Sequence, residues 1–329
     1  MKRRRFLLVV GFISLIAAAL GRPIPVVFHT DIGTDIDDAW ALAQILRTPA
    51  LDLKFVLTDT GDTRYRAALA AKELEAANRT DVAIGIGQPT PHSNDTMTVQ
   101  SWLKGFDLKN YPGQVYDDGI GAFIDFVMHS PEPVTIISTG PCPSLAAALA
   151  REPGIAARCR FVGMDGSIDI GYGKKAPAAA ESNVKVDPAA FRKVLSAPWR
   201  DRLITPLDTC GSVYLKGDDY HAIWCATGDP LLRAVIESYC IFAPNAPWMR
   251  VDYFTTQSTT LFDCVAVYLA SSEDLVETET MRLRVTDDGF TVRDPDGSPV
   301  RVALRWKNLA AFDHQLVRTL LAAPAAVAR

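Results

Sequence analysis

The chain has 329 residues, of which 48% are hydrophobic and 22% are charged. This composition is that of a globular protein with ample material for a large core. The formal net charge is -4 at pH 7, and beyond residue 5 the Lys and Arg residues are scattered. A weakly acidic chain without a basic patch excludes nucleic acid as the expected partner.

The first residues have the layout of an export signal. Basic residues 2–5 precede an apolar run over residues 6–20, which ends in small side chains. This run is shorter than the roughly 20 residues that span a bilayer. We therefore predict a cleaved signal peptide over residues 1–22, with an uncleaved anchor as the alternative. The mature chain would then be secreted or periplasmic, without a stable membrane anchor.

Short apolar runs alternate with helical patterns along most of the remaining chain. The runs that predict strands cover residues 25–28, 53–57, 82–86, 134–137 and 161–164. Predicted helices cover residues 37–47 and 64–78, and another begins at Asp187-Pro188, where Pro suits a first turn. This alternation predicts an α/β fold with a mainly parallel open sheet flanked by helices.

The C-terminal part has a different pattern. Residues 281–285, 290–292 and 302–304 alternate between polar and apolar side chains and are separated by Asp/Gly turns. They predict a small antiparallel element, which a last helix over residues 308–321 closes. We see no repeat or linker, so we predict a single domain over residues 23–329.

The cysteines agree with export but leave their own chemistry open. Six are present, and none forms a Cys-x-x-Cys pair that would favour zinc. An oxidising compartment permits disulfides, and buried free thiols are the alternative. These residues are Cys142, Cys159, Cys210, Cys225, Cys240 and Cys264.

The loop after the first predicted strand carries the strongest chemical signal. It contains Asp31, Asp35, Asp37 and Asp38, and it leads into the first helix. Four like charges this close repel one another unless a cation compensates them. The partial positive charge of a helix N-terminus accounts for one or two of them. Carboxylates without Cys or several His suit a hard cation, calcium or magnesium.

Two other carboxylate motifs do not fit this loop. An EF-hand would require Gly where Ile36 stands and Glu where Leu42 stands. An aspartyl-phosphatase loop that begins with Asp31 as the nucleophile would require Asp where Gly33 stands. In an open α/β sheet such loops meet beyond the carboxyl ends of the strands, where ligands bind.

With three further motifs, this loop resembles the inosine–uridine-preferring nucleoside hydrolase family. That family has an aspartate-rich loop ending in Asp-Asp-Ala, as in residues 31–39, although here it is longer. Residues 138–146 look like its Thr-Gly-Pro-x-x-x-Leu-Ala segment, and residues 164–166, 181–183 and 187–188 look like its Met-x-Gly, Glu-x-Asn and Asp-Pro block. Residues 262–267 look like its late Asp-x-x-Ala-Val segment. The motifs occur in the family's order, from about residue 24 to 270.

The resemblance implies calcium-dependent hydrolysis of the N-ribosidic bond of a ribonucleoside to ribose and free base. Calcium would be held by three carboxylates and one backbone carbonyl, from Asp31, Asp38, Asp263 and Thr139. Asp31 would also take a proton from the attacking water. Ribose would be held by Asp37, Asp62, Met164, Glu181 and Asn183, with Asp35 as a substitute for Asp37. Carboxylates around the sugar suit an oxocarbenium-like transition state.

The departures from the family lie on the leaving-group side. Phe262 stands where the family often has His before its late metal-binding Asp, and Asp118 stands where it often has another His. His29 replaces the first Asp of the family's loop, and Asp62 stands in place of Asn. The half of the site that activates water is therefore predicted to be complete, and the acid that protonates the base is not identified.

At several positions the sequence leaves two interpretations open. We expect His29 to hydrogen-bond to the acidic loop rather than to catalyse. His92 and His221 are candidate acids, although surface positions are the commoner case. Trp102 either stacks on the base or packs in the protein, and Asp118 either enters the base pocket or caps a helix.

Two alternatives to a nucleoside hydrolase remain. One is a hydrolase of another N-ribosyl compound, whose leaving group departs without protonation. The other is a non-catalytic binder of nucleosides or ribose, which the missing histidines motivate. In each case the expected partner is a small molecule, and a homo-oligomer is left open.

Overall fold

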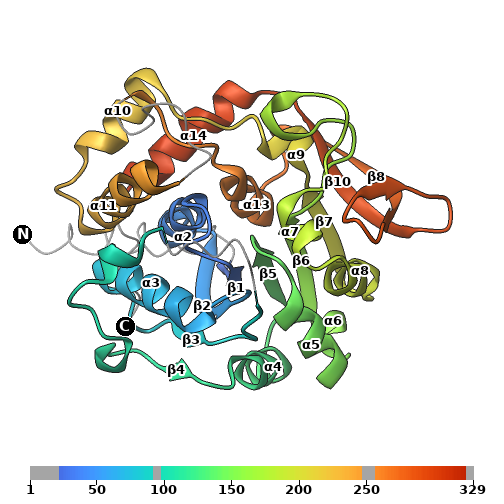
Figure 1. The fold of residues 1–329 in the computed structure, drawn as a ribbon, viewed down its shortest axis with the longest axis horizontal. Helices are drawn as coiled ribbons and strands as arrows, with labels where there is room; N and C mark the ends of the chain where they lie inside the picture. The colour runs from blue at the N-terminus through green and yellow to red at the C-terminus, as the bar shows by residue number, and fades with distance from the viewer. Residues whose placement is uncertain (1–21, 92–97, 247–255, 324–329) are drawn as a thin grey trace, which may run out of the picture.

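The computed structural model describes residues 22–91, 98–246 and 256–323 (Figure 1). Apart from Arg22, the predicted signal peptide lies outside these residues, as does His92. Within the described ranges, no helix has both the length and the apolar character needed to cross a membrane.

The strands of the described residues form one sheet. Its ten strands follow the order β4-β3-β2-β1-β5-β6-β7-β10-β8-β9. All neighbours from β4 to β10 are parallel, and β8 is antiparallel to both β10 and β9. The strands are β1 (Ile24–Thr30), β2 (Leu51–Thr58), β3 (Ala83–Gly85), β4 (Val115–Tyr116), β5 (Val134–Ser138), β6 (Cys159–Met164), β7 (Asp201–Thr205), β8 (Val276–Val285), β9 (Thr291–Arg293) and β10 (Ser298–Trp306).

Helices cover both faces of the sheet, and each face has its own apolar core. Alternate residues of a strand point to opposite faces, so Val26 and Phe28 enter one core and Val27 the other. The first core includes side chains of α2 (Asp37–Arg47), α3 (Thr63–Ala76), α9 (Leu207–Cys210), α10 (Gly217–Cys225), α11 (Pro230–Asn245), α13 (Phe262–Ser271) and α14 (Leu309–Leu321). The second includes α4 (Gly119–His129), α5 (Pro143–Arg151), α6 (Ile155–Arg158), α7 (Ser182–Val186) and α8 (Pro188–Ser196).

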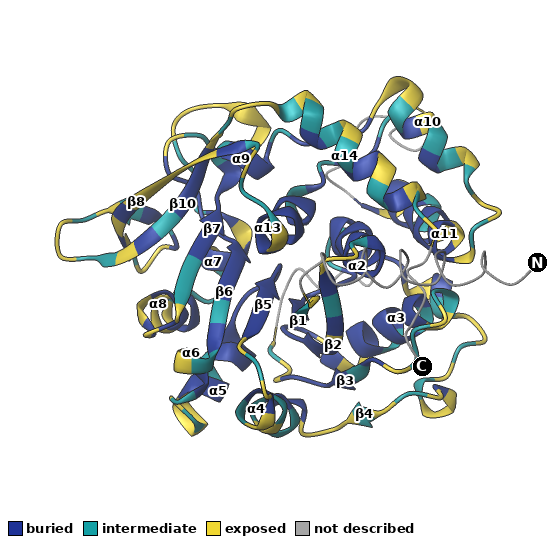
Figure 2. Cartoon of the chain, turned by 180° about the vertical axis from the view of Figure 1, so that it is seen from behind, coloured by how far each residue is buried: buried dark blue, intermediate teal, exposed yellow. Residues whose placement is uncertain are grey.

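Two of the helices in the first core are buried along most of their length. Every residue of α2 is buried, and α13 is buried from Asp263 to Ala270 (Figure 2). The burial therefore includes the acidic residues in the first turns of both helices. Three short 3-10 turns complete the described elements: η1 (Gln100–Leu103), η2 (Leu108–Asn110) and η3 (Tyr172–Lys174).

The predicted fold class is confirmed, with three differences in detail. Strand β4 was not predicted, because it has only two residues. Strand β7 was not predicted, because Asp201 and Arg202 leave only Leu203 and Ile204 as a short apolar signal. Strand β8 begins at Val276, five residues before the alternating pattern starts, because residues 277–280 are exposed and polar. The antiparallel C-terminal part is confirmed, and β10 joins it to the main sheet by pairing in parallel with β7.

The six cysteines are free thiols in this structure. Cys225 is exposed and Cys240 is partly buried, whereas the other four are buried. This matches the free-thiol alternative.

Candidate active site

The acidic and glycine-rich loops meet at one edge of the sheet, as the sequence predicted. In the parallel register His29 of β1 lies beside Ser138 of β5, and Ser138 lies beside Gly163 of β6. The residues that follow these positions, Asp31 and Thr139 among them, are therefore brought to the same edge. They come from segments that are far apart in the sequence.

The conformation of the acidic loop depends on a glycine and on an arginine side chain that binds backbone carbonyl oxygens. Gly33 has φ +99°, and a Cβ there would lie 2.5 Å from Leu69 Cδ1, so only glycine fits. The buried Arg66 of α3 donates to the carbonyl oxygens of Asp31, Ile32 and Thr60, the last at 2.6 Å. Sequence reasoning missed Arg66, because its helix pattern alone does not show that its side chain reaches this loop.

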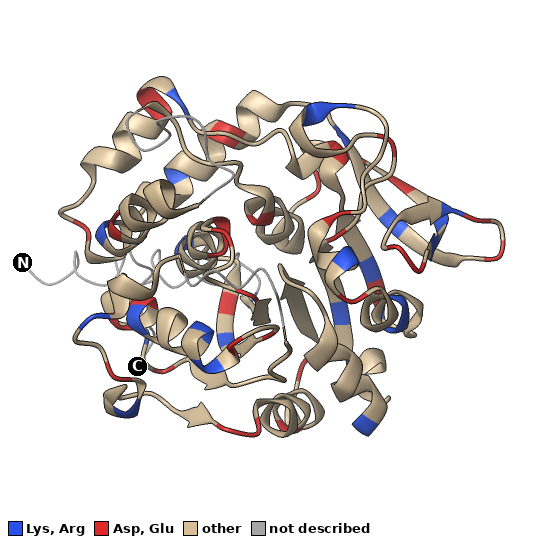
Figure 3. Cartoon of the chain, in the orientation of Figure 1, with Lys and Arg blue, Asp and Glu red and all other residues tan. Residues whose placement is uncertain are grey.

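Three carboxylates form a compact buried group, which we call the carboxylate group: Asp37, Asp38 and Asp263. One oxygen from each lies within 4.8 Å of the other two, and the residues are only 4%, 2% and 3% exposed. They come from the first turns of α2 and α13, which carry the acidic segments in the middle of Figure 3. Asp263 donates its backbone N–H to Asp37 Oδ2 at 3.4 Å across 226 residues of sequence.

Hydroxyl groups orient one member of this group. Asp38 Oδ1 accepts from Thr30 Oγ1 at 2.5 Å and from Thr139 Oγ1 at 2.8 Å. Asp31 lies close by, because its charge raises the pKa of all three acids. A Cβ on Gly140 would come within 2.9 Å of Asp31 Oδ1. The absence of a side chain at Gly140 thus lets the Thr-Gly-Pro loop approach Asp31.

The electrostatics of the carboxylate group are unfavourable without a cation. Burial raises the pKa of Asp37, Asp38 and Asp263 well above the ordinary value, and repulsion among the acids, Asp31 included, raises it further. Burial also raises the pKa of Asp31, while Arg66 acts in the opposite direction. Within residues 22–91, 98–246 and 256–323, no Lys or Arg side chain forms an ion pair with the carboxylate group.

The donor chemistry therefore fits a hard divalent cation. Oxygen ligands that carry several negative charges are those that calcium and magnesium prefer. A bound cation would reverse the effect of burial by favouring the charged form of each acid. Of the predicted ligands, Asp38 and Asp263 lie in the carboxylate group. The carboxylate group also includes Asp37, which we predicted to hold ribose. The division of these acids between metal and ribose stays a prediction.

Three of the predicted ribose residues contact one another beside Thr139. Asn183 Nδ2 donates to the Met164 carbonyl at 2.9 Å and to the Thr139 carbonyl at 3.1 Å. Glu181 is buried and caps α7 by accepting backbone N–H groups, including that of Asn183 at 2.8 Å. Burial raises the pKa of Glu181 to about 7.

The fourth aspartate of the loop and Asp62 lie in more accessible positions. Asp35 is partly exposed and accepts from the Ile36 N–H at 2.6 Å. Burial raises its pKa to about 6. Asp62 is exposed and caps α3 by accepting the N–H groups of Arg64 and Tyr65 at 3.1 and 2.9 Å. Its predicted ribose contact stays a prediction.

The surroundings of Phe262, where the leaving group was expected, are aromatic. The ring of Phe262, directly before Asp263, lies edge-on to Tyr172 with ring centroids 6.3 Å apart. Tyr172 is 46% exposed, and its hydroxyl accepts the N–H of Ser182 at 2.9 Å. Sequence reasoning missed Tyr172; a Tyr between two glycines, Gly171 and Gly173, in a loop after a strand was the available signal.

Most of the open positions have structural roles. Asp118 caps α4 and pairs with Arg151 at 3.0 Å. Trp102 is buried, with Lys72 Nζ 4.4 Å from its ring centroid, so packing explains it. His221 is on the surface helix α10, 3.4 Å from Cys225 Sγ.

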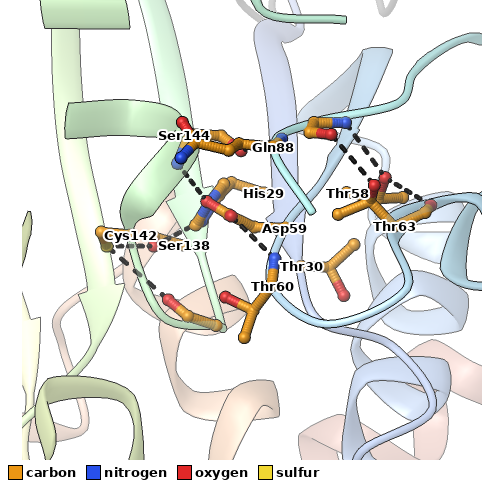
Figure 4. Close-up of polar contacts among 12 residues, drawn as sticks. His29, Thr30, Thr58, Asp59, Thr60, Thr63, Gln88, Ser138, Cys142 and Ser144 are labelled. Atoms are coloured by element: carbon orange, nitrogen blue, oxygen red, sulfur yellow. Dashed lines mark hydrogen bonds and ion pairs between the residues drawn. The ribbon is translucent and has the colours of Figure 1, made fainter. Parts of the chain in front are cut away.

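The expectation for His29 needs a correction. We expected this residue to hydrogen-bond to the acidic loop. Its ring instead contacts Asp59, directly after β2, and Ser138 at the end of β5, the two strands that flank β1 (Figure 4). The reason is that β1 lies between β2 and β5 in the sheet, which the order along the chain does not show.

The same fold occurs in solved nucleoside hydrolases. The plant nucleoside hydrolase PpNRh1 superposes with a TM-score of 0.70 at 21% identity, covering 92% of this chain and 100% of that one. The inosine-uridine preferring nucleoside hydrolase from Bacillus anthracis gives a TM-score of 0.70 at 19% identity, covering 90% and 99%. Fold and carboxylate group together place the chain in the class of nucleoside hydrolase-like α/β proteins.

Sequence comparison defines the family. The model of the inosine-uridine preferring nucleoside hydrolases matches residues 26–314, and the chain belongs to this family. The pyrimidine-specific ribonucleoside hydrolase RihA of Salmonella newport is 30% identical over 65% of this chain and 70% of its own length. The non-specific ribonucleoside hydrolase RihC of Klebsiella pneumoniae is 32% identical over 52% and 57%. These relatives are N-glycosyl hydrolases, and this chain is an enzyme of that kind.

Proposed function

We propose that the protein hydrolyses the N-ribosidic bond of ribonucleosides in a calcium-dependent reaction that releases ribose and the free base. The observation that carries this proposal is the carboxylate group beside Asp31. No Lys or Arg in the described part of the chain forms an ion pair with these three buried acids, so together they are stable in the charged form only when a cation binds. The relatives' names supply the substrate class, ribonucleosides.

Calcium would be held by the carboxylates of Asp31, Asp38 and Asp263 and by the Thr139 carbonyl. When bound, calcium offsets the repulsion among the acids and polarises the attacking water. The Thr139 carbonyl already accepts a hydrogen bond from Asn183, and a carbonyl oxygen has two lone pairs. It can therefore serve both partners.

Asp31 would act as the general base. It is 7% exposed, and the Thr-Gly-Pro loop packs directly against it, so its orientation is restricted. Removing a proton from water in the transition state is worth about 10²–10⁴-fold in rate. The sugar would develop positive charge as the bond to the base breaks, and the surrounding acids would stabilise that charge.

Ribose would be held by Asp37, Met164, Glu181 and Asn183, with Asp62 at the outer side and Asp35 as a substitute. Asn183 joins Met164 to Thr139 through its amide, so the sugar pocket and the proposed calcium ligand share one set of hydrogen bonds. A shared framework of this kind fixes the distance between water and the reacting carbon.

The test is release of free ribose from a panel of purine and pyrimidine nucleosides, with and without a calcium chelator. We expect turnover that the chelator abolishes and added calcium restores, and no turnover by Asp31→Ala. Asp288→Ala, an exposed substitution in the turn between β8 and β9, is the control for expression and handling. If no nucleoside in the panel yields ribose, the proposed substrate class is wrong.

One observation favours a second candidate substrate. Phe262, which packs on Tyr172, stands where the family often has a histidine that can donate a proton. The Phe262 ring has no proton to donate to a departing base, but an aromatic face suits a flat cationic leaving group. Such a substrate resembles nicotinamide riboside, whose base leaves without protonation. A higher kcat/KM for that compound than for inosine, reversed by Phe262→His, would support it; equal values in both proteins would rule it out.

The proposal includes export to the periplasm or outside the cell through residues 1–22, with one catalytic domain from residue 23. N-terminal sequencing of the protein purified from its native compartment tests this. A mature chain that begins near residue 22 is expected, and a chain that retains residues 6–20 would contradict it.

A further inference from the structure

A buried hydrogen-bond network lies directly beneath the acidic loop (Figure 4). His29 Nε2 is 2.7 Å from Asp59 Oδ2, and His29 Nδ1 is 2.9 Å from Ser138 Oγ. All three residues are 0% exposed. The set resembles a Ser–His–Asp triad in composition, but no substrate can reach a fully buried hydroxyl, so it is not a nucleophilic site.

The network connects the three strands whose ends build the site. His29 lies on β1, Ser138 is its register partner on β5, and Asp59 follows β2. The backbone reinforces the link, because the His29 carbonyl accepts the Thr139 N–H at 2.9 Å. Asp59 in turn donates its N–H to the Thr30 carbonyl at 2.9 Å. The strand ends are thus cross-linked just before Asp31 and Thr139.

Asp59 is the fixed end of this network. Besides His29, it accepts the N–H of Thr60 at 2.8 Å and the N–H of Ser144 at 2.8 Å. Ser144 is in the first turn of α5, where backbone N–H groups and the helix dipole favour a negative charge. A buried carboxylate with three donors is strongly oriented, and through His29 it fixes Ser138 as well.

The effect of the network reaches the carboxylate group by one further step. Thr139, whose backbone N–H donates to the His29 carbonyl, donates its hydroxyl proton to Asp38 Oδ1 at 2.8 Å. We propose that His29, together with Asp59 and Ser138, positions Asp31, Asp38 and Thr139 for cation binding. These three are positioning residues, because they touch neither the substrate nor the reacting atoms. The inference rests on the proposed function.

The test compares two serine-to-alanine variants at opposite ends of β5. Ser138→Ala removes the hydroxyl that His29 contacts. Ser130→Ala is the matched control, because it removes a buried hydroxyl that bonds to the Glu132 carbonyl at 2.7 Å before the strand begins. Calorimetry measures the calcium dissociation constant of each purified, folded full-length chain, and ribose release gives kcat and KM.

We expect Ser138→Ala to bind calcium about 10–100-fold more weakly than the control, as is typical when a group that orients metal ligands is lost. At saturating calcium, kcat should fall while KM for the nucleoside changes little, because none of the side-chain bonds of His29, Asp59 and Ser138 given above reaches a residue proposed to hold ribose. His29→Ala should have the larger effect, and His29→Ala/Ser138→Ala no more than His29→Ala alone, because both act through one network. If His29→Ala fails to fold, Ser138→Ala alone decides.

Two outcomes would overturn the inference, and they are distinguishable. Wild-type protein that neither binds calcium nor releases ribose would overturn the proposed function and this inference with it. Active, calcium-binding wild type with Ser138→Ala indistinguishable from Ser130→Ala in both dissociation constant and kcat would overturn the inference alone.

Discussion

Two clusters of acidic side chains in the described residues, one at the amino ends of strands and one at the starts of two helices, are built in opposite ways. At the amino ends of β6 and β7, Arg160 lies beside Asp201 in register, and the two side chains pair at 3.0 Å. Arg301 of β10 pairs with the same Asp201 at 2.9 Å and with Glu273, which also meets Arg160 at 3.1 Å. These four residues form a closed ring in which every acid has two arginine partners.

Among the residues that the structure describes, the carboxylate group has no such arginine partners. Asp37, Asp38 and Asp263 are more deeply buried than the ring, yet they face one another. Burying a charge without compensation costs several kcal/mol, so such an arrangement persists only where a ligand compensates it. The ring stabilises the fold by itself, whereas the carboxylate group gives up stability to create a cation site.

Removal of the cation should have the largest effect on activity, because only the carboxylate group depends on a bound ion. Exhaustive chelation is expected to lower kcat/KM for a nucleoside by about 10³-fold or more, because metal assistance is worth several kcal/mol. The measurement is ribose release before chelation, after it, and after titration with calcium or magnesium. Full activity of demonstrably metal-free protein would show that the acids serve another purpose.

Asp31→Asn should follow in size. We expect kcat to fall by about 10²–10⁴-fold, because the general base is lost. The chelated variant should unfold at the same temperature as chelated wild type or above it, because one repelling acid has been removed. Steady-state kinetics and thermal unfolding measure the two effects. A variant that loses activity only because it has become unstable would contradict this assignment.

The stability of the chelated protein should depend on pH in a defined direction. The folded-state pKa values of Asp37, Asp38 and Asp263 are raised above the unfolded value of about 3.9. Their contribution is therefore fully present below that value and is lost as pH rises through the folded pKa values. Denaturant unfolding in chelator should give a free energy at pH 8 lower than at pH 5 by about 1 kcal/mol or more.

Calcium and a single substitution serve as controls for this pH effect. Added calcium should restore the free energy of unfolding at pH 8, because it stabilises the charged carboxylates. Asp263→Asn should flatten the pH dependence in chelator, because one of the three titrating acids is gone. Equal stability of the chelated wild type at pH 5 and pH 8 would contradict the raised pKa values.

The smallest effect is expected at the arginine ring. Arg301→Ala should lower the free energy of unfolding by about 1 kcal/mol. The side chains of the ion pairs are about two-thirds buried, and solvent screens the remaining part of the interaction. Activity should stay within about twofold of wild type. Arg305→Ala on the same strand is the matched control, since its exposed pair with Glu277 at 3.6 Å should contribute almost nothing. A loss of activity well beyond twofold in folded Arg301→Ala would show that the two clusters are coupled.

Local features of the fold were predictable because they depend on neighbours in the sequence. The alternation of apolar runs and helical patterns gave the parallel sheet, and Asp187-Pro188 marked the start of α8, where Asp187 caps the helix by accepting from Ala190 N–H at 2.8 Å. Strand β7 was not predicted, because its apolar run is only two residues long. The density of charge in the acidic loop was enough to predict a bound cation, while the roles of its individual aspartates stay predictions.

What the sequence by itself determined is therefore the acidic loop, its position after a parallel strand and the family to which its motifs belong. Only the tertiary structure decided which acids share one space, because packing of α13 against α2 joins residues 226 positions apart. The same holds for His29, whose partners are defined by the order of strands in the sheet. Asp62 and Asp118 look alike in sequence as candidate site residues, and their surroundings make both of them helix caps. Side-chain identity is local, but the compensation of a buried charge depends on what folding brings next to it.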